Sequence, residues 1–136
     1  MGIGTKNGKP FFREVNGVSS RYTGMDGENT ACDYLTGMGA KILDRNVRLA
    51  GAGGEIDIIA CLEGTYLFVE VKRRSSGKYG APIAAVTPAK ARRILRAASL
   101  YLAMHGLSDR PVRFDVIEIL PGTVRHIPAA FDGTYL

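Results

Sequence analysis

The sequence has few of the residues that cross-link small domains or build zinc sites. Its 136 residues include only two cysteines, Cys32 and Cys61, and neither lies in a CxxC or Cys/His spacing. A zinc finger and a disulfide framework are therefore excluded. The two thiols are typical of small buried residues in a reducing compartment.

The sequence also shows no pattern typical of a targeting segment or of a membrane-spanning segment. The first residues, MGIGTK, lack the apolar stretch of a signal peptide, and Lys6 breaks the N-myristoylation motif. No uninterrupted apolar run is long enough to cross a bilayer. We therefore expect a soluble, cytoplasmic protein with no membrane partner.

Motifs for nucleotide cofactors and for nucleophilic catalysis are absent as well. The chain has no P-loop and no GxGxxG, which disfavours dinucleotide cofactors. His105 and His126 have no Cys or Ser partner at a recognisable spacing, so ordinary surface roles are expected for both.

The length predicts one domain with a substantial core. Residues 1–23, rich in Gly, Lys, Asn and Ser, are expected to form a mobile N-terminal extension, residues 24–128 the folded domain, and residues 129–136 a C-terminal tail. The order helix, strand, strand, strand, helix, strand predicts an α/β sandwich with a central mixed sheet. The expected elements are a helix over 26–38, a strand over 41–49, two strands within 54–74, a helix over 88–105, a strand over 111–120 and a last short one over 124–127.

Positive charge is concentrated in one part of the chain. The net charge is +5, yet residues 70–110 carry nine basic and two acidic residues, a net charge of +7. This distribution indicates a polyanionic partner, most simply nucleic acid. A solvated basic helix face is the alternative. The residues expected to contact phosphates are Arg73, Arg74, Lys78, Lys90, Arg92, Arg93 and Arg96.

The stretch from Gly54 to Arg74 predicts two strands joined by a tight turn at Glu63 and Gly64. It carries acids where a buried strand normally has none. With that turn, Asp57 faces Glu70 on one side of the hairpin, whereas a bulged loop would shift the pairing by one residue. The opposite side is expected to hold Ile56, Ile58, Ala60, Leu67, Val69 and Val71.

Opposed carboxylates need a cation between them, because like charges facing each other across a strand pair are destabilising. Asp57 and Glu70 offer hard oxygen ligands suited to Mg²⁺ or Mn²⁺. Lys72, which faces Glu55 in the same register, would orient the attacking water in metal-dependent phosphodiester hydrolysis. Glu55 is a further candidate site residue. Glu28, by its own position, is an acid that complements the dipole at a helix start.

Several motifs in one order resemble the bacterial endonuclease-like proteins called the YraN family. The resemblance spans Gly24 to Ile127, and its motifs are GxxGE, YL followed by Gly39, ILxRNxR, GEIDIIA, FVEVKRR, AVTPAKARR and RFDVI. It implies a restriction-endonuclease-like fold of the PD-(D/E)xK type, similar to that of archaeal Holliday-junction resolvases. It also implies Glu28, Asp57, Glu70 and Lys72 as the active-site set, with Glu28 reaching the metal from the first helix.

The function expected from these observations is a divalent-metal-dependent endonuclease acting on DNA, with branched or damaged structures as candidate substrates. A module that binds nucleic acid without cutting it is the alternative, and an RNA substrate is left open. A junction-directed enzyme would be expected to act as a two-fold homodimer.

Overall fold

The computed structural model describes residues 5–6, 9–10, 13–16, 27–74 and 86–132. Asp26, the first residue of the helix expected over 26–38, and Lys78, an expected phosphate contact, lie outside these residues. The elements are β1 (Thr5–Lys6), β2 (Lys9–Pro10), β3 (Arg13–Asn16), α1 (Gly27–Gly37), β4 (Lys41–Arg48), β5 (Glu55–Leu62), β6 (Thr65–Arg73), α2 (Pro88–Met104), β7 (Val112–Leu120) and β8 (Thr123–Phe131).

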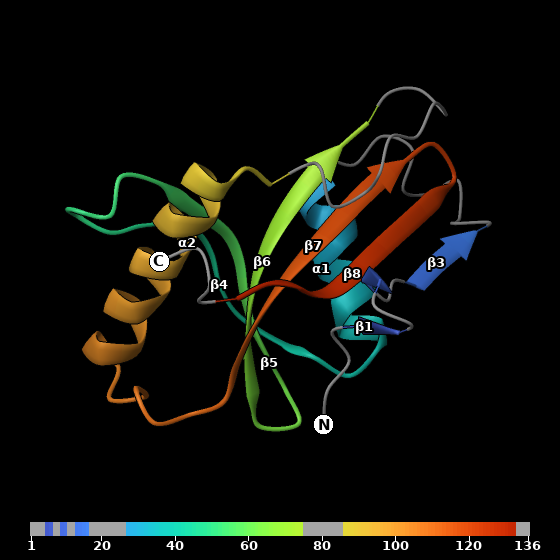
Figure 1. Cartoon of the computed structure of the whole chain (residues 1–136). Coiled ribbons are helices and arrows are strands. Elements are labelled where there is room, and N and C mark those ends of the chain that lie inside the picture. The colour runs from blue at the N-terminus through green and yellow to red at the C-terminus, as the bar shows by residue number, and fades with distance from the viewer. Residues whose placement is uncertain (1–4, 7–8, 11–12, 17–26, 75–85, 133–136) are drawn as a thin grey trace.

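A six-stranded sheet in the order β3-β8-β7-β6-β5-β4 forms the centre of the domain (Figure 1). Strands β4, β5 and β6 are antiparallel neighbours, and β8 is antiparallel to β7. Strands β6 and β7 are parallel, so their connection must cross over, and α2 lies within it. The predicted mixed sheet and element order are confirmed, and the short last strand is longer than expected.

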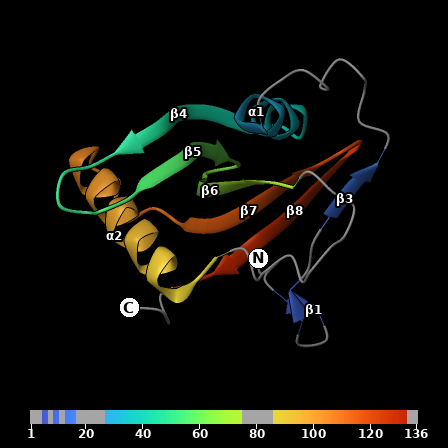
Figure 2. The same ribbon diagram turned by 90° about the horizontal axis from the view of Figure 1, so that it is seen from above.

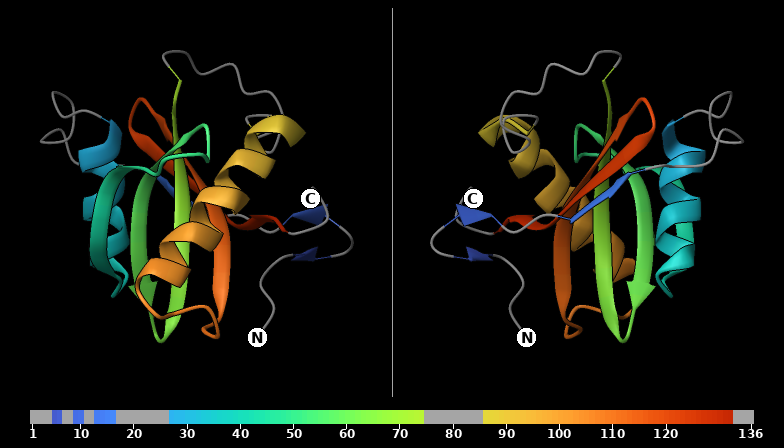
Figure 3. Two further views of the ribbon diagram at one scale, coloured as in Figure 1. Left: turned by 90° about the vertical axis from the view of Figure 1, so that its left-hand side faces the viewer. Right: turned by 90° about the vertical axis from the view of Figure 1, so that its right-hand side faces the viewer.

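The two helices cover opposite faces of the sheet, as the view from above shows (Figure 2). The side views show the same three layers, with α1 on one side and α2 on the other (Figure 3). Each helix packs on its own apolar cluster. Phe68 and Ile59 belong to the cluster under α2, whereas Leu67 and Ile58 belong to the one under α1. Alternate residues of β6 therefore serve the two halves of the core.

Local signals fix the ends of the central elements. Glu63 and Gly64 have φ values of 50° and 84°, as a two-residue hairpin turn with both central residues left-handed requires. Thr87 caps α2 by accepting a hydrogen bond from the Lys90 N–H at 3.1 Å, and Pro88 follows at the first helical position.

Strand pairing extends into the segment expected to be an N-terminal extension. β1 pairs with β2, and β3 pairs with β8 in antiparallel register from Arg13↔His126 to Asn16↔Thr123. β3 thus forms one edge of the main sheet, and β4 forms the other.

A chain of buried polar groups links α1 to β7 and β8. The fully buried Asp115 accepts hydrogen bonds from Arg113 and from the Ala129 N–H, and it is bonded to His126 Nε2 at 2.7 Å. His126 Nδ1 lies 2.9 Å from the Tyr34 hydroxyl. A surface role for His126 is therefore wrong, because this histidine is fully buried between an acid and a phenol.

His105 is exposed at the end of α2, in keeping with a surface position. Its ring stacks on Tyr101, and its Nδ1 bonds the Tyr101 carbonyl at 2.8 Å.

A second buried acid, Glu118, forms ion pairs with two arginines. Arg74 Nε donates to it at 2.8 Å, and Arg125 lies 3.3 Å away.

None of the helices in the described part of the chain is long and apolar enough to cross a membrane.

Replacement of Asp115 by Asn should destabilise the fold strongly. Burial alone would raise the pKa of Asp115, but its hydrogen bonds with His126 and Arg113 outweigh burial and lower the pKa below 3.8. The ionised form therefore stabilises the fold above pH 3.8, and that contribution disappears as the pH falls through the lowered pKa. We expect Asp115→Asn to cost roughly 3–5 kcal/mol in urea unfolding at pH 7.

The exposed Asp33 provides the matched control, because Asp33→Asn changes the same functional group at the surface. A loss for Asp115→Asn no larger than that of Asp33→Asn would contradict the assigned network.

Candidate functional site

The hairpin register agrees with the sequence prediction, but the pairing stops short of the acids. Pairs run from Leu62↔Thr65 to Ile58↔Val69, which centres the turn on Glu63 and Gly64. Glu55 pairs with Arg48 on β4, and Lys72 pairs with Glu118 on β7. The pairing of β5 with β6 thus ends just before Asp57 and Glu70.

The prediction that the β5 side chains alternate strictly between the two faces is wrong at Ile56. Ile56 packs in the cluster under α2, whereas Ile58 packs under α1, although both were expected on one face. On β4 the pairs Arg45↔Ile58 and Val47↔Ile56 flank Asn46, whose φ is 54°. A left-handed residue rotates a strand locally, so the faces of β4 and β5 change over at this point.

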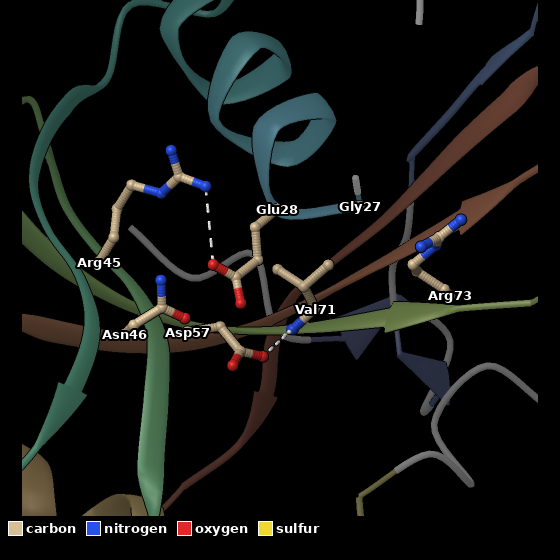
Figure 4. Close-up of a pocket in the computed structure, with 7 residues that line it drawn as sticks. All are labelled: Gly27, Glu28, Arg45, Asn46, Asp57, Val71 and Arg73. Atoms are coloured by element: carbon tan, nitrogen blue, oxygen red, sulfur yellow. Dashed lines mark hydrogen bonds and ion pairs between the residues drawn. The ribbon is translucent and has the colours of Figure 1, made fainter. Parts of the chain in front are cut away.

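Asp57 lies at this irregularity, and its carboxylate replaces a strand partner for β6. Its Oδ2 accepts a hydrogen bond from the Val71 N–H at 2.8 Å (Figure 4). The side chain therefore bridges from the end of the paired region of β5 to the main chain of β6.

Glu70 is the more deeply buried of the two acids, with 4% of its surface exposed. Two lysines neutralise the same carboxylate oxygen, Oε2. Lys72 Nζ lies 3.8 Å from it, and Lys90 Nζ from α2 forms a closer ion pair with it. Lys90, expected from the sequence to contact nucleic acid, is thus placed beside the acids.

The pKa of Asp57 is raised to about 7. Burial is the largest cause, the hydrogen bond from Val71 opposes it, and the charges of Glu70 and Glu28 raise the pKa further. A hydrogen bond between the Asp57 and Glu70 side chains also contributes. The Asp57 carboxyl group therefore keeps its proton up to near neutral pH.

A pocket of about 370 Å³ opens beside Asp57 on the α1 side of the sheet. Figure 4 shows Glu28 projecting from the first turn of α1 into the same space as Asp57, with Glu28 Oε1 held 3.6 Å from Arg45 Nη2. An acid at this helix position is also favoured by the helix dipole. The pocket is lined by Gly27, Glu28, Arg45, Asn46, Asp57, Val71 and Arg73.

Gly27 allows α1 to begin close against β6. A Cβ atom at this position would lie 2.6 Å from Arg73 Cγ, which is too short for any real contact. The absence of a side chain therefore brings Glu28 and Arg73 to the same pocket.

The other predicted site residues lie apart from the acid pair. Glu55 is 3.6 Å from Arg48, and Arg74 is bonded to the buried Glu118. Arg92 and Arg96 are exposed on α2, whereas Arg93 packs against the Gly53 and Gly54 backbone.

Among the polar residues of the pocket, Arg45 and Asn46 were not predicted as site residues. Both belong to the ILxRNxR motif, and an asparagine inside a strand favours a left-handed conformation. That preference was the available signal for the irregularity opposite Asp57.

The donor chemistry fits a hard divalent cation, although the fit is incomplete. Asp57 and Glu70 are neighbouring carboxylates, and Mg²⁺ characteristically binds through one or two carboxylates and keeps several waters. Within the described ranges no three His, Cys, Asp or Glu side chains lie close enough together to hold a metal. Glu28 therefore acts on Asp57 through its charge without closing a three-carboxylate cluster.

Comparison with known proteins places the chain in a family. The sequence profile of "Uncharacterised protein family UPF0102" matches residues 27–119, which include α1, the acids, α2 and most of β7. The chain belongs to the UPF0102 family. The family predicted from the sequence motifs, also called YraN, is thereby confirmed.

Relatives of similar length occur in diverse bacteria. A UPF0102 protein of Symbiobacterium thermophilum is 52% identical over 76% of this chain and 86% of its own length. The UPF0102 protein of Clostridioides difficile is 44% identical over 84% of this chain and all of its own length. That of Geobacter metallireducens is 47% identical over 87% of this chain and 98% of its own length.

Asp57 should make the stability of the protein depend on pH when divalent cations are chelated. Below pH 3.8 the folded and unfolded states are both protonated at this group. Between pH 3.8 and about 7 the folded state keeps a proton that the unfolded state releases, so stability falls as the pH rises. Asp57→Asn removes this charge but keeps an acceptor for the Val71 N–H. We expect its melting temperature to exceed that of the wild type above pH 8 by a few °C, roughly the effect of 1 kcal/mol.

The difference between Asp57→Asn and the wild type should shrink toward pH 5 in thermal melts with EDTA. Asp33→Asn is again the control. A difference that is the same at pH 5 and pH 8.5 would argue against a raised pKa at Asp57.

Proposed function

We propose that the protein is a divalent-metal-dependent endonuclease of the PD-(D/E)xK type, with a restriction-endonuclease-like fold and DNA as its substrate. The observation that carries this proposal is the acid pair at the end of the β5–β6 pairing, the half-buried Asp57 and the buried Glu70, with Lys72 two residues after Glu70 on β6. This pair differs from charges that are buried to stabilise a fold. Its environment raises the pKa of Asp57 to about 7, and the folded protein therefore loses stability at neutral pH.

Asp57 and Glu70 are the residues that would hold Mg²⁺ or Mn²⁺, and Glu28, in the first turn of α1, would add negative charge beside Asp57. When bound, the ion supplies a Lewis acid that polarises the scissile phosphate and makes a water molecule more acidic. The Lys72 side chain, which is one third exposed beside Glu70, would orient the attacking water and offset negative charge at the phosphate.

Basic residues on both sides of the sheet supply the substrate contacts in this proposal. Arg73 lines the pocket beside Asp57, and Arg92 and Arg96 are exposed on α2. Contacts of this kind bind the phosphate backbone without reading sequence, which suits a nuclease directed by DNA structure. Arg74 has a smaller part in the proposal, because its Nε is bonded to the buried Glu118.

Cleavage assays with purified protein test the proposal directly. With Mg²⁺ or Mn²⁺ we expect the wild type to cut at least one of linear, flapped and four-way-junction DNA. Asp57→Ala and Glu70→Ala should each lower the rate by about 100-fold or more, since each removes charge that stabilises the transition state. Asp33→Ala should cut like the wild type.

Each alternative gives a distinct result. Cleavage that persists in both acid variants would overturn the site assignment. Metal-independent binding to all DNA substrates without cleavage would favour a non-catalytic binding module, and selective cutting of the matching RNA substrates would reassign the substrate.

Thermal melts give a readout that is independent of catalysis. Mn²⁺ at 100 times its Kd should stabilise the wild type by about 2.7 kcal/mol. The gain should be much smaller for Asp57→Asn, which lacks a charged ligand. Equal shifts for the two proteins would show that Mn²⁺ binds elsewhere.

A further inference from the structure

Lys90 occupies a position in α2 where helix stability does not favour a lysine. It follows the N-cap Thr87 by three residues, the place where a capping box has Glu or Gln. The first turn of α2 contains no acid, and a cation there opposes the helix dipole. An interaction other than helix capping must therefore account for a lysine at this position.

The contact of Lys90 supplies that interaction. Its Nζ forms an ion pair with Glu70 Oε2, the oxygen that Lys72 approaches only to 3.8 Å. The Glu70 side chain is 4% exposed, whereas the Lys90 side chain is 34% exposed. A buried carboxylate is thus paired with a lysine whose side chain is about one third exposed to solvent.

We propose that Lys90 is a positioning residue that competes with a divalent cation for Glu70 Oε2, so that cation binding requires Lys90 to leave the carboxylate. This inference rests on the proposed cation site but not on nuclease activity. Two positive charges cannot share one carboxylate oxygen at contact distance without strong repulsion. The ammonium group of Lys90 therefore weakens cation binding and keeps Glu70 oriented until a cation replaces it.

Lys72 has a different part in this arrangement. At 3.8 Å it is a weaker competitor for the same oxygen, and it follows Glu70 by two residues on the same strand. Removal of Lys72 should therefore change cation affinity less than removal of Lys90.

Titration of Mn²⁺ alone into the full-length protein, followed by calorimetry or by the EPR signal of free Mn²⁺, tests the proposal. Lys90→Met keeps the aliphatic stem but removes the charge, and it should tighten the Mn²⁺ Kd by about ten-fold. Lys72→Met should tighten it less. Lys90→Arg, which retains the charge, should stay near the wild-type Kd. Arg92→Met, on the exposed face of the same helix, should leave the Kd unchanged.

The contrary results are equally defined. An unchanged or weaker Mn²⁺ Kd in Lys90→Met would overturn the proposal and leave Lys90 as a structural counterion. The same would follow from equal tightening in Arg92→Met, which would indicate a general charge effect. If Lys90→Met melts at a lower temperature, Lys90→Gln provides a second neutral variant for the comparison.

Glu70→Gln separates this inference from the proposed function. The gain in Mn²⁺ affinity should vanish in the double variant Lys90→Met/Glu70→Gln, and a gain that persists would overturn the proposal. Glu70-dependent tightening in a protein that cuts no nucleic acid would support the role of Lys90 while the nuclease proposal fails. Metal-dependent cleavage with an unchanged Kd in Lys90→Met would give the opposite outcome.

Discussion

The rest of the site depends on the contact between two carboxyl groups, those of Asp57 and Glu70. The contact exists because β5 and β6 stop pairing after Ile58 and Val69, which leaves the Asp57 carboxylate to bond the Val71 N–H. Burial raises the pKa of Asp57 to about 7, while lysines neutralise Glu70. The pocket opens beside Asp57, and Glu28 and Arg73 lie in its lining.

The buried networks of the sheet explain how the acids can be held in this way. Glu28 enters the pocket from α1, and α1 is fixed to β8 through the hydrogen bond between Tyr34 and His126. The ion pair of Arg74 with Glu118 likewise fixes the end of β6 to β7. Charges inside the sheet therefore position the elements that carry the site, although they lie outside the pocket.

Much of the fold could be predicted because its signals are local. The turn at Glu63 and Gly64, the cap at Thr87 and the apolar alternation of β6 each depend on a few neighbouring residues. The parallel placement of β7 beside β6 also follows from a strand, a helix and a strand in sequence. These features need no knowledge of distant contacts.

The parts that sequence reasoning missed depend on contacts between distant residues. His126 is buried because Asp115 and Tyr34 satisfy both of its nitrogens, and no spacing rule links those three positions. Lys90 was expected to contact phosphates, but the crossover brings it to Glu70. The reversal at Ile56 follows from a left-handed Asn46 on the adjacent strand, which strict alternation does not allow for.

The bond from Val71 to Asp57 gives the main chain of β6 a direct link to the state of the site. This N–H has a side chain as its acceptor at the point where the pairing with β5 has ended. Any ligand that draws the carboxylate away must leave the amide to water. The hydrogen-exchange rate of the Val71 amide would then rise when a ligand binds the Asp57 carboxylate. This amide proton therefore reports whether the site is occupied.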